Sequence, residues 1–190
     1  MELINQIYQN KCYTPSDINE HLPVLKRYAE ECDIVVEMGV RSIVSTWAFL
    51  SARPKKLISL DIVHPGEYIN HDPEGCDLDL VKKLSDENGI DFTFILGDSL
   101  KGSPIVCDLL FIDTLHDYDQ LKGELEIYAS SCRKYIILHD TTHFAEEGET
   151  KGKAGIWGAI VEFLEKNKEW EIKERLTNNN GMTILKNKAL

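Results

Sequence analysis

The apolar residues of this chain occur in short continuous runs and at helical spacings. The runs predict five buried strands, which cover residues 33–39, 56–60, 92–96, 107–112 and 134–138. Between them, apolar residues three and four positions apart predict helices over 45–51, from Leu78 to the Asn88-Gly89 pair, over 118–128 and after residue 155. Strands joined by helices of this length are parallel neighbours in one sheet.

The two ends of the chain add further elements. Thr14-Pro15-Ser16-Asp17 combines a capping hydroxyl, a proline and a carboxylate, which predicts a helix from there to about Glu31. A kink or break near Leu22 is expected, because Pro23 lies inside this span. Toward the other end, residues 170–176 and 182–185 flank Thr-Asn-Asn-Asn-Gly, a turn signal that predicts an antiparallel hairpin.

These elements predict an α/β fold with a doubly wound, Rossmann-like, mostly parallel sheet and a C-terminal antiparallel hairpin. We expect a single domain over residues 1–190, with an N-terminal helical segment at 1–32 and an α/β core at 33–186. Residues 62–76 and 141–155 are rich in polar residues and glycine, so we predict loops there. The second is expected to be mobile and to cover the site, with Glu146, Glu147 and Glu149 in solvent.

Composition narrows the choice of partners. The chain has 43% hydrophobic residues and a net charge of −11, and no segment gathers Lys and Arg, so nucleic acid and membrane are not expected partners. Its five cysteines are widely spaced and lack a C-x-x-C pair, which favours reduced thiols. No apolar run approaches the ~20 residues of a membrane helix, and we expect a soluble cytoplasmic protein.

Polar side chains follow the predicted strands at the ends where parallel strands meet. They are, in chain order, Glu37, Asp61, Asp98, Asp113 with His116, and His139 with Asp140, and Gly39 ends the first of these strands. In open α/β sheets ligands bind beside the carboxyl ends of the strands, so we expect these residues to converge on one site. A carboxylate at such an end is placed to accept hydrogen bonds from ribose hydroxyls.

The motifs Glu37-Met-Gly39-Val-Arg-Ser-Ile-Val-Ser45, Asp61, Gly97-Asp98-Ser99 and Asp113-x-x-His116 resemble those of the class I S-adenosylmethionine (SAM)-dependent methyltransferases. Within that family the chain is most similar to the metal-dependent O-methyltransferases of the catechol and macrolide-sugar types and to their cephalosporin-hydroxylase-like relatives. The resemblance covers roughly residues 34–185, and the blocks FIDTLHDYDQLKGEL and ILHDT are its most specific part.

The resemblance implies a SAM-dependent O-methyltransferase that acts on a hydroxyl of a small polar acceptor, such as a sugar or glycan unit. The cofactor-binding positions that it implies are Glu37, Gly39, Ser45, Asp61, Asp98, Ser99 and Asp113. It also implies that Asp113 and Asp140 hold a divalent ion, usually Mg²⁺ and otherwise Mn²⁺, and that His116 is the general base. An ion of this kind makes a hydroxyl more acidic, and an imidazole can take its proton near neutral pH.

Two positions depart from the family pattern. Ile43 stands where the first motif usually has glycine, and its larger side chain is expected to narrow the cofactor cleft. His139 precedes Asp140 where the sugar-modifying relatives often carry an acid, and we include it among the metal ligands. A histidine ligand shifts preference from magnesium toward manganese, iron, nickel or zinc.

Other interpretations stay open at this point. Ile43 favours a methyltransferase-like fold that serves as a binding or scaffolding module, and the strand-end residues also suit a metal-dependent enzyme with different chemistry. His116 could be a surface residue, and His139 could be buried and bonded to backbone. The other histidines, among them His21, have no partner fixed by spacing and receive no role. The exposed edge of the hairpin permits a homodimer.

Overall fold

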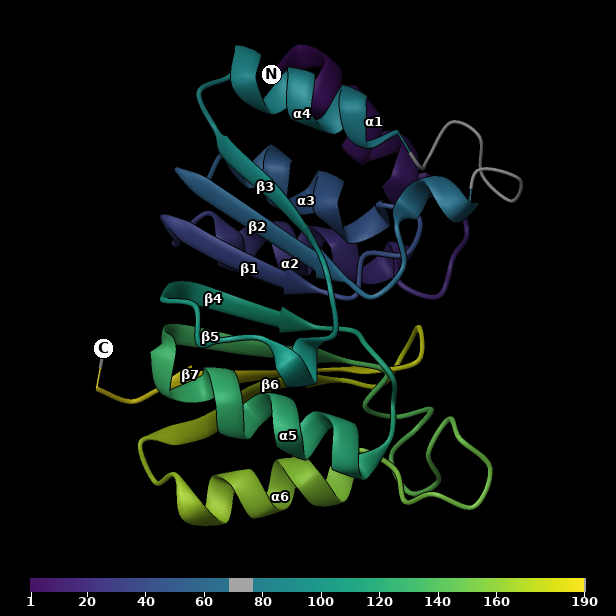
Figure 1. Cartoon of the computed structure of the whole chain (residues 1–190), viewed down its shortest axis with the longest axis vertical. Coiled ribbons are helices and arrows are strands. Elements are labelled where there is room, and N and C mark those ends of the chain that lie inside the picture. Colours follow the sequence, from purple (N-terminus) through teal and green to yellow (C-terminus); the bar gives the residue numbers. More distant parts are fainter. Residues whose placement is uncertain (69–76, 190) are drawn as a thin grey trace.

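A computed structural model describes residues 1–68 and 77–189 of the chain. At its centre lies a seven-stranded sheet with the order β3-β2-β1-β4-β5-β7-β6 (Figure 1). Neighbours among β1 to β5 pair in parallel, whereas β7 runs antiparallel to both β5 and β6. The strands are β1 (Ile34–Met38), β2 (Lys56–Asp61), β3 (Asp91–Leu96), β4 (Cys107–Ile112), β5 (Cys132–His139), β6 (Trp170–Leu176) and β7 (Met182–Asn187).

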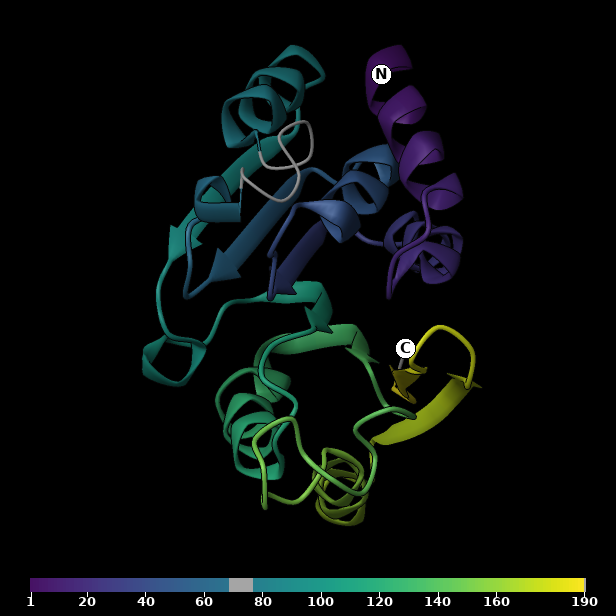
Figure 2. The same cartoon turned by 90° about the vertical axis from the view of Figure 1, so that its right-hand side faces the viewer.

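Helices cover both faces of the sheet, which explains why the inner strands are continuous apolar runs. The helices are α1 (Glu2–Tyr13), α2 (Leu22–Ala29), α3 (Val44–Ala52), α4 (Leu78–Glu87), α5 (Tyr118–Tyr128) and α6 (Trp157–Lys166). Helices α1 to α4 share one hydrophobic core with alternate strand residues such as Leu109 and Phe111. Helices α5 and α6 lie on the other face of the sheet (Figure 2). They share a second core with the strand residues between those of the first, such as Leu110 and Ile112.

The strand order places a switch point between β1 and β4. The chain proceeds from β1 outward to β2 and β3 and then returns to form β4 on the other side of β1. The connections on the two sides of this point leave on opposite faces of the sheet, so a crevice forms beyond the carboxyl ends of β1 and β4.

The predicted α/β fold with its C-terminal hairpin is confirmed, and the predicted strands lie within one or two residues of the observed ones. Helices α3 to α6 also lie where apolar spacing predicted them. The predicted loop at 62–76 contains a 3-10 turn at Pro65–Tyr68, and its residues 69–76 lie outside the described residues.

The predicted helix from Thr14 to about Glu31 is wrong in its first part, and the break expected near Leu22 is the point at which α2 begins. Thr14 instead ends α1, since its backbone N–H and hydroxyl both donate to the Asn10 carbonyl. The chain then passes through a 3-10 turn at Asn19–His21, and α2 begins only at Leu22. Pro23 therefore lies in the first turn of α2, where its missing N–H costs nothing, rather than inside a longer helix.

Helix α1 lies in the segment expected to be helical, but it was not predicted as a separate helix. Its inward face carries Ile4, which is fully buried, and the partly buried Ile7, Tyr8 and Cys12. These positions are spaced as one helical face, so the signal was present but was spread over a mostly polar segment.

The remaining sequence expectations on thiols and membranes concern absences. The described cysteines, Cys12, Cys32, Cys107 and Cys132, are free thiols. In the part of the chain that the structure covers, no helix is both long and apolar enough to cross a membrane.

Candidate active site

A cavity of about 520 Å³ lies at the carboxyl ends of β1, β2, β3 and β4. The predicted site residues that line it are Gly39, Ser45, Asp61, Asp98, Ser99, Asp113, His116 and Asp140. Glu37 and His139 are the predicted site residues that do not line it. The cavity has the size and location expected of a small-molecule site in this class of fold.

The turn after β1 brings two strand ends together. Gly39 has φ +84°, and a Cβ atom at this position would lie 1.9 Å from the backbone oxygen of Asp113. The Asp113 N–H donates to the Met38 carbonyl over 2.8 Å and fixes this close approach. Only glycine fits at residue 39, and its absence of a side chain lets the β4 end come alongside the turn.

Ile43 does not narrow the cavity as expected. Its backbone is left-handed, with φ 60°, a conformation that costs a β-branched residue about 1–3 kcal/mol. The side chain is fully buried and packs into the core formed with α1 to α4, and it is not among the residues that line the cavity. Ile43 therefore has the left-handed backbone conformation that glycine would adopt there, and its side chain points away from the cavity.

Glu37 does not reach the cavity in this structure. It is fully buried, and its carboxylate accepts hydrogen bonds from the hydroxyls of Ser45, Thr46 and Ser59. Burial raises the pKa of Glu37 to about 7, although the three hydroxyls act in the opposite direction. The residue ties the start of α3 to β1 and β2, and it thereby supports the turn that follows β1.

Asp61 ends β2 at the wall of the cavity. Its Oδ2 accepts from the N–H groups of Val40 and Arg41 at 2.7 and 2.8 Å, and its Oδ1 accepts from Val63 at 2.9 Å. Each carboxylate oxygen has about two lone-pair positions, so Oδ1 retains one for a ligand hydroxyl. Asp61 therefore holds the β1 turn and still has an acceptor position that faces the cavity.

Asp98 and Ser99 lie beyond β3 at the opposite wall. The Asp98 carboxylate accepts from the Leu100 N–H and pairs with Lys101 at 3.1 Å. The Ser99 hydroxyl donates to the buried carboxylate of Glu124, which also accepts from Thr114. Glu124 was not predicted as part of the site, because on α5 it looks like one more helical glutamate. Only the fold shows that it joins the loop after β3 to the loop after β4.

Asp113, His139 and Asp140 form a cluster that could hold a metal ion. One ligand atom from each lies within 4.8 Å of the others. The His139 Nδ1 is 3.4 Å from Asp113 and 3.3 Å from Asp140. The His139 Nδ1 and the Asp140 Oδ1 are buried and lack a hydrogen-bond partner among the described residues. Buried atoms of this kind need a partner, and two carboxylates with an imidazole are a donor set that suits a divalent cation.

The charged groups of this cluster shift one another's pKa values. Burial lowers the pKa of His139, but Asp113 and Asp140 outweigh it and raise that pKa to about 10. Burial raises the pKa of Asp113, and the two neighbouring histidines reverse this and hold it well below its usual range. The two carboxylates therefore favour the positively charged form of the His139 imidazole.

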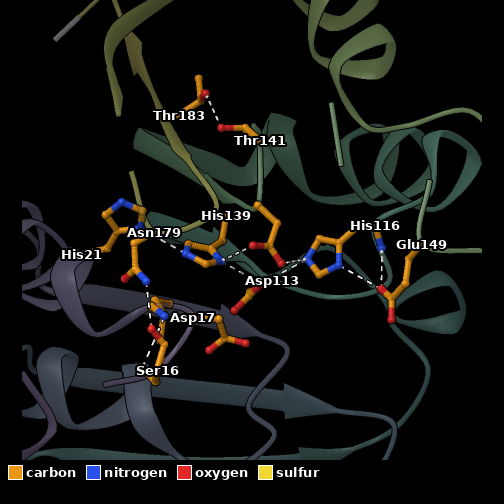
Figure 3. A network of polar contacts seen from close by, with 12 residues as sticks. Ser16, Asp17, His21, Asp113, His116, His139, Thr141, Glu149, Asn179 and Thr183 are labelled. Atoms are coloured by element: carbon orange, nitrogen blue, oxygen red, sulfur yellow. Dashed lines mark hydrogen bonds and ion pairs between the residues drawn. The ribbon is translucent and has the colours of Figure 1, made fainter. Parts of the chain in front are cut away.

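His116 is held between carboxylates on both sides of its ring (Figure 3). Its Nε2 lies 3.2 Å from Asp113 and 3.0 Å from Asp140, and its Nδ1 lies 2.9 Å from Glu149. The ring of Phe144 stacks on the imidazole of His116, and the two ring centroids are 4.8 Å apart. Burial lowers the pKa of His116, whereas the three carboxylates raise it by more, and the net result is a raised pKa.

Glu149 is exposed, as predicted for this loop, but nothing in the sequence indicated that it also belongs to the site. It lines the cavity and binds both the ring and the backbone N–H of His116. The loop that carries it is fastened to the start of α5, since Thr150 N–H donates to Asp117 and Tyr118 N–H donates to the Ala154 carbonyl. These contacts place the loop beside the site, as predicted, and its mobility stays a prediction.

His139 is bonded to another histidine and not to backbone. The His21 Nδ1 lies 3.0 Å from the His139 Nε2, and both rings are buried. His21 belongs to the segment before α2, 118 positions away in the sequence. No periodicity or spacing could have paired the two residues.

Similarity to known proteins is found in the fold and not in the sequence. No protein-family model matches the sequence, and no curated protein matches it. Among solved structures, the chain resembles an O-methyltransferase from Bacillus cereus in complex with SAH, with 13% identity, a TM-score of 0.62 and coverage of 98% of this chain and 91% of that one.

Two other structures show how widely this fold is used. TomG from Streptomyces achromogenes, an O-methyltransferase of tomaymycin synthesis in complex with SAM, has 14% identity and a TM-score of 0.59, with 92% of this chain and 81% of that chain covered. The 16S rRNA methylase RmtB has 14% identity and a TM-score of 0.53, with 90% and 63% covered. The chain thus has the class I methyltransferase fold that its motifs resembled, and this fold alone does not select an acceptor.

Proposed function

We propose that the protein is a SAM-dependent, divalent-metal-assisted O-methyltransferase that acts on a hydroxyl of a small polar acceptor. The observation that carries the proposal is the convergence of two sets of residues on one cavity. Residues suited to a nucleoside line the walls beyond β2 and β3, and the carboxylate and histidine cluster lies beyond β4 and β5.

The cofactor side of the proposal rests on acceptors placed around the β1 turn. Asp61 offers an oxygen for ribose hydroxyls, Ser45 lines the cavity at the start of α3, and Asp98 and Ser99 flank the opposite wall. Gly39 allows close approach to the backbone of the turn. Glu37 contributes indirectly, through the hydroxyl of Ser45.

The catalytic side rests on four residues with distinct tasks. Asp113, His139 and Asp140 would hold the cation, and His116 would accept the proton of the acceptor hydroxyl. When bound, SAM supplies an electrophilic methyl group and the cation lowers the pKa of a hydroxyl. Asp113 and Asp140 are also among the carboxylates that raise the pKa of His116. A cation bound to both would offset their charge and bring the pKa of this imidazole back toward the range of a general base.

Glu149 and Phe144 keep the base in place. Glu149 binds the His116 Nδ1, so the Nε2 is the nitrogen that faces the cavity side of the cluster. The stacked ring of Phe144 excludes water from one face of the imidazole. A fixed base and a fixed acceptor account for much of the acceleration that such a site can provide.

Charge around the cavity supports an acceptor without negative charge. The carboxylates that line it are Asp17, Asp61, Asp98, Asp113, Asp140 and Glu149. Among the described lining residues, Arg41 is the one with a cationic side chain of Lys or Arg type, and it pairs with Asp17 at 2.9 Å. A phosphorylated or carboxylated acceptor would be repelled, whereas a neutral sugar or glycan unit fits the resemblance to sugar-modifying relatives.

The alternative of a binding module has lost its main support. It was motivated by Ile43, and this side chain lies in the core rather than in the cavity. The rest of the proposal follows the sequence expectations: a cytoplasmic protein that works without nucleic acid or membrane, with a net charge of −11 that disfavours both. A homodimer through the exposed edge of β6 is compatible with it.

Calorimetric titration of SAM, with and without Mg²⁺ or Mn²⁺, tests the proposal. We expect one-to-one binding in the micromolar range, followed by transfer of radiolabelled methyl to a member of a panel of neutral sugars. The Asp61→Asn variant should lose affinity, and Asp91→Asn, at the opposite end of the sheet, is the matched control. A folded protein that gives no heat and no thermal shift at millimolar SAM with metal present contradicts the proposal.

A further inference from the structure

His21 is a buried histidine for which the proposed reaction has no use. It lies in the 3-10 turn before α2 and is fully inaccessible to solvent. Its ring meets His139 edge-on, with centroids 5.2 Å apart and planes at 75°. The His21 Nδ1 and the His139 Nε2 are 3.0 Å apart, which is hydrogen-bonding distance.

The segment that carries His21 is fixed by the turn between β6 and β7 (Figure 3). Asn179 accepts from the Glu20 N–H at 3.0 Å and donates to the Ser16 carbonyl at 2.8 Å. The Asn180 carbonyl of the same turn accepts from the N–H groups of Thr142 and His143 at 2.9 Å. One turn therefore positions both the His21 segment and the chain that follows Asp140.

The contact with His21 decides which nitrogen of His139 faces the carboxylates. His21 occupies the Nε2, so the Nδ1 is directed at Asp113 and Asp140. For the Nδ1 to bind a cation its lone pair must be free, which requires the ring proton on the Nε2. The His21 Nδ1 can accept that proton in a hydrogen bond and thereby select this tautomer.

A nitrogen ligand changes which cation the cluster prefers. Mg²⁺ favours a shell of oxygen atoms alone and retains several waters, whereas imidazole suits Mn²⁺, Fe²⁺, Co²⁺, Ni²⁺ and Zn²⁺. Without His21, the His139 ring could turn or change its tautomer and leave the two carboxylates as the only fixed ligands. A site formed by these two carboxylates alone would discriminate less between Mg²⁺ and a transition ion.

We propose that His21 is a positioning residue that holds His139 as a nitrogen ligand and so makes the cluster selective for a divalent transition ion over Mg²⁺. This inference rests on the metal site of the proposed function and does not depend on SAM or on an acceptor. It can therefore fail while methyl transfer is confirmed, and it can hold in a protein that transfers no methyl group.

The test measures binding of Mn²⁺ and Mg²⁺ by calorimetry in the full chain. We expect the wild type to prefer Mn²⁺, and His21→Phe, which keeps a ring but cannot accept a hydrogen bond, to lose about 10–100-fold in Mn²⁺ affinity. Its Mg²⁺ affinity should change much less. His21→Gln, which keeps an acceptor, should recover part of the loss, and His64→Phe, an exposed histidine, is the control.

Two spectroscopic readouts report the ligands of the bound ion directly, and the first is made on the wild type. Coupling of a nitrogen nucleus to bound Mn²⁺ in pulsed electron paramagnetic resonance of the wild type should report the imidazole ligand, and His139→Asp should abolish it. The visible absorption of bound Co²⁺ should change in His21→Phe. Equal affinity of the wild type for Mn²⁺ and Mg²⁺, absence of nitrogen coupling, or unchanged Mn²⁺ binding in folded His21→Phe would each overturn the inference.

Discussion

The buried carboxylate of Glu37 makes a prediction about stability that can be measured without any ligand. Glu37 is fully inaccessible and is surrounded by the hydroxyls of Ser45, Thr46 and Ser59. Replacing it by glutamine keeps the shape and removes the ionisable group. The comparison of the two proteins across pH then isolates what this one carboxylate contributes.

The sign follows from the raised pKa. Burial is the largest cause and raises the pKa of Glu37 from 4.5 to about 7 in the folded protein. Between these two values the folded state binds more protons than the unfolded state, so the free energy of unfolding decreases as pH rises. Below pH 4.5 and above pH 7 this contribution is constant. At ~1.4 kcal/mol per pH unit, the decrease across the window is about 3 kcal/mol.

Urea unfolding at half-unit steps from pH 4 to 8 measures the effect. Relative to the wild type, Glu37→Gln should gain about 3 kcal/mol in the free energy of unfolding between the two ends of this range. All other titrating groups are common to both proteins and cancel in the difference. In the control variant Glu165→Gln, at an exposed position of α6, the free energy of unfolding should change with pH as it does in the wild type. If Glu37→Gln also followed the wild type in this way, Glu37 would not be a buried, proton-binding carboxylate, and its position beneath the turn would be wrong.

Three further substitutions test the site itself. Gly39→Ala places a Cβ atom 1.9 Å from the Asp113 oxygen at φ +84°, so we expect a loss of about 3 kcal/mol or more in urea unfolding. Asp61→Asn replaces one of the two carboxylate oxygens by an NH2 donor, so at least one of three N–H groups loses its acceptor, and it should weaken SAM binding at least about tenfold in calorimetry. His116→Ala should lower kcat by about 10²–10⁴-fold while SAM affinity is nearly unchanged.

Each of these outcomes has a counterpart that would contradict it. A Gly39→Ala protein of wild-type stability would show that the β1 turn and the β4 end are not in close contact. Wild-type SAM affinity in Asp61→Asn would remove this residue from the cofactor site. Full activity in His116→Ala would exclude His116 as the base, even with SAM and metal binding intact.

Much of the fold was accessible from local patterns. The continuous apolar runs predicted the inner strands because a strand buried on both faces has no polar alternation. The helical spacings and the connection lengths then fixed parallel pairing. The prediction for the N-terminal segment failed because Thr14 and Pro23 are each compatible with more than one position in a helix. Packing of Ile4 against the core places a helix before Thr14, so that Thr14 ends this helix and does not begin one.

The candidate site was predicted as a set of strand ends, and the structure brings most of those residues to one cavity. The sequence did not predict the residues that contact this set from distant positions in the chain. Glu149 reaches His116 across 33 positions and His21 reaches His139 across 118. Such contacts leave no spacing in the sequence, because the chain between them can have any length that the loops allow.

The sequence by itself determined the strands, the helices that separate them, the acidic charge and the chemical types of side chain at the strand ends. These follow from backbone geometry and from the period of apolar residues, which are local properties. Only the tertiary structure decided where each side chain points. It buried Glu37 beneath the turn, directed Ile43 into the core and left the His139 Nδ1 facing two carboxylates, because those directions depend on how separate layers pack against one another.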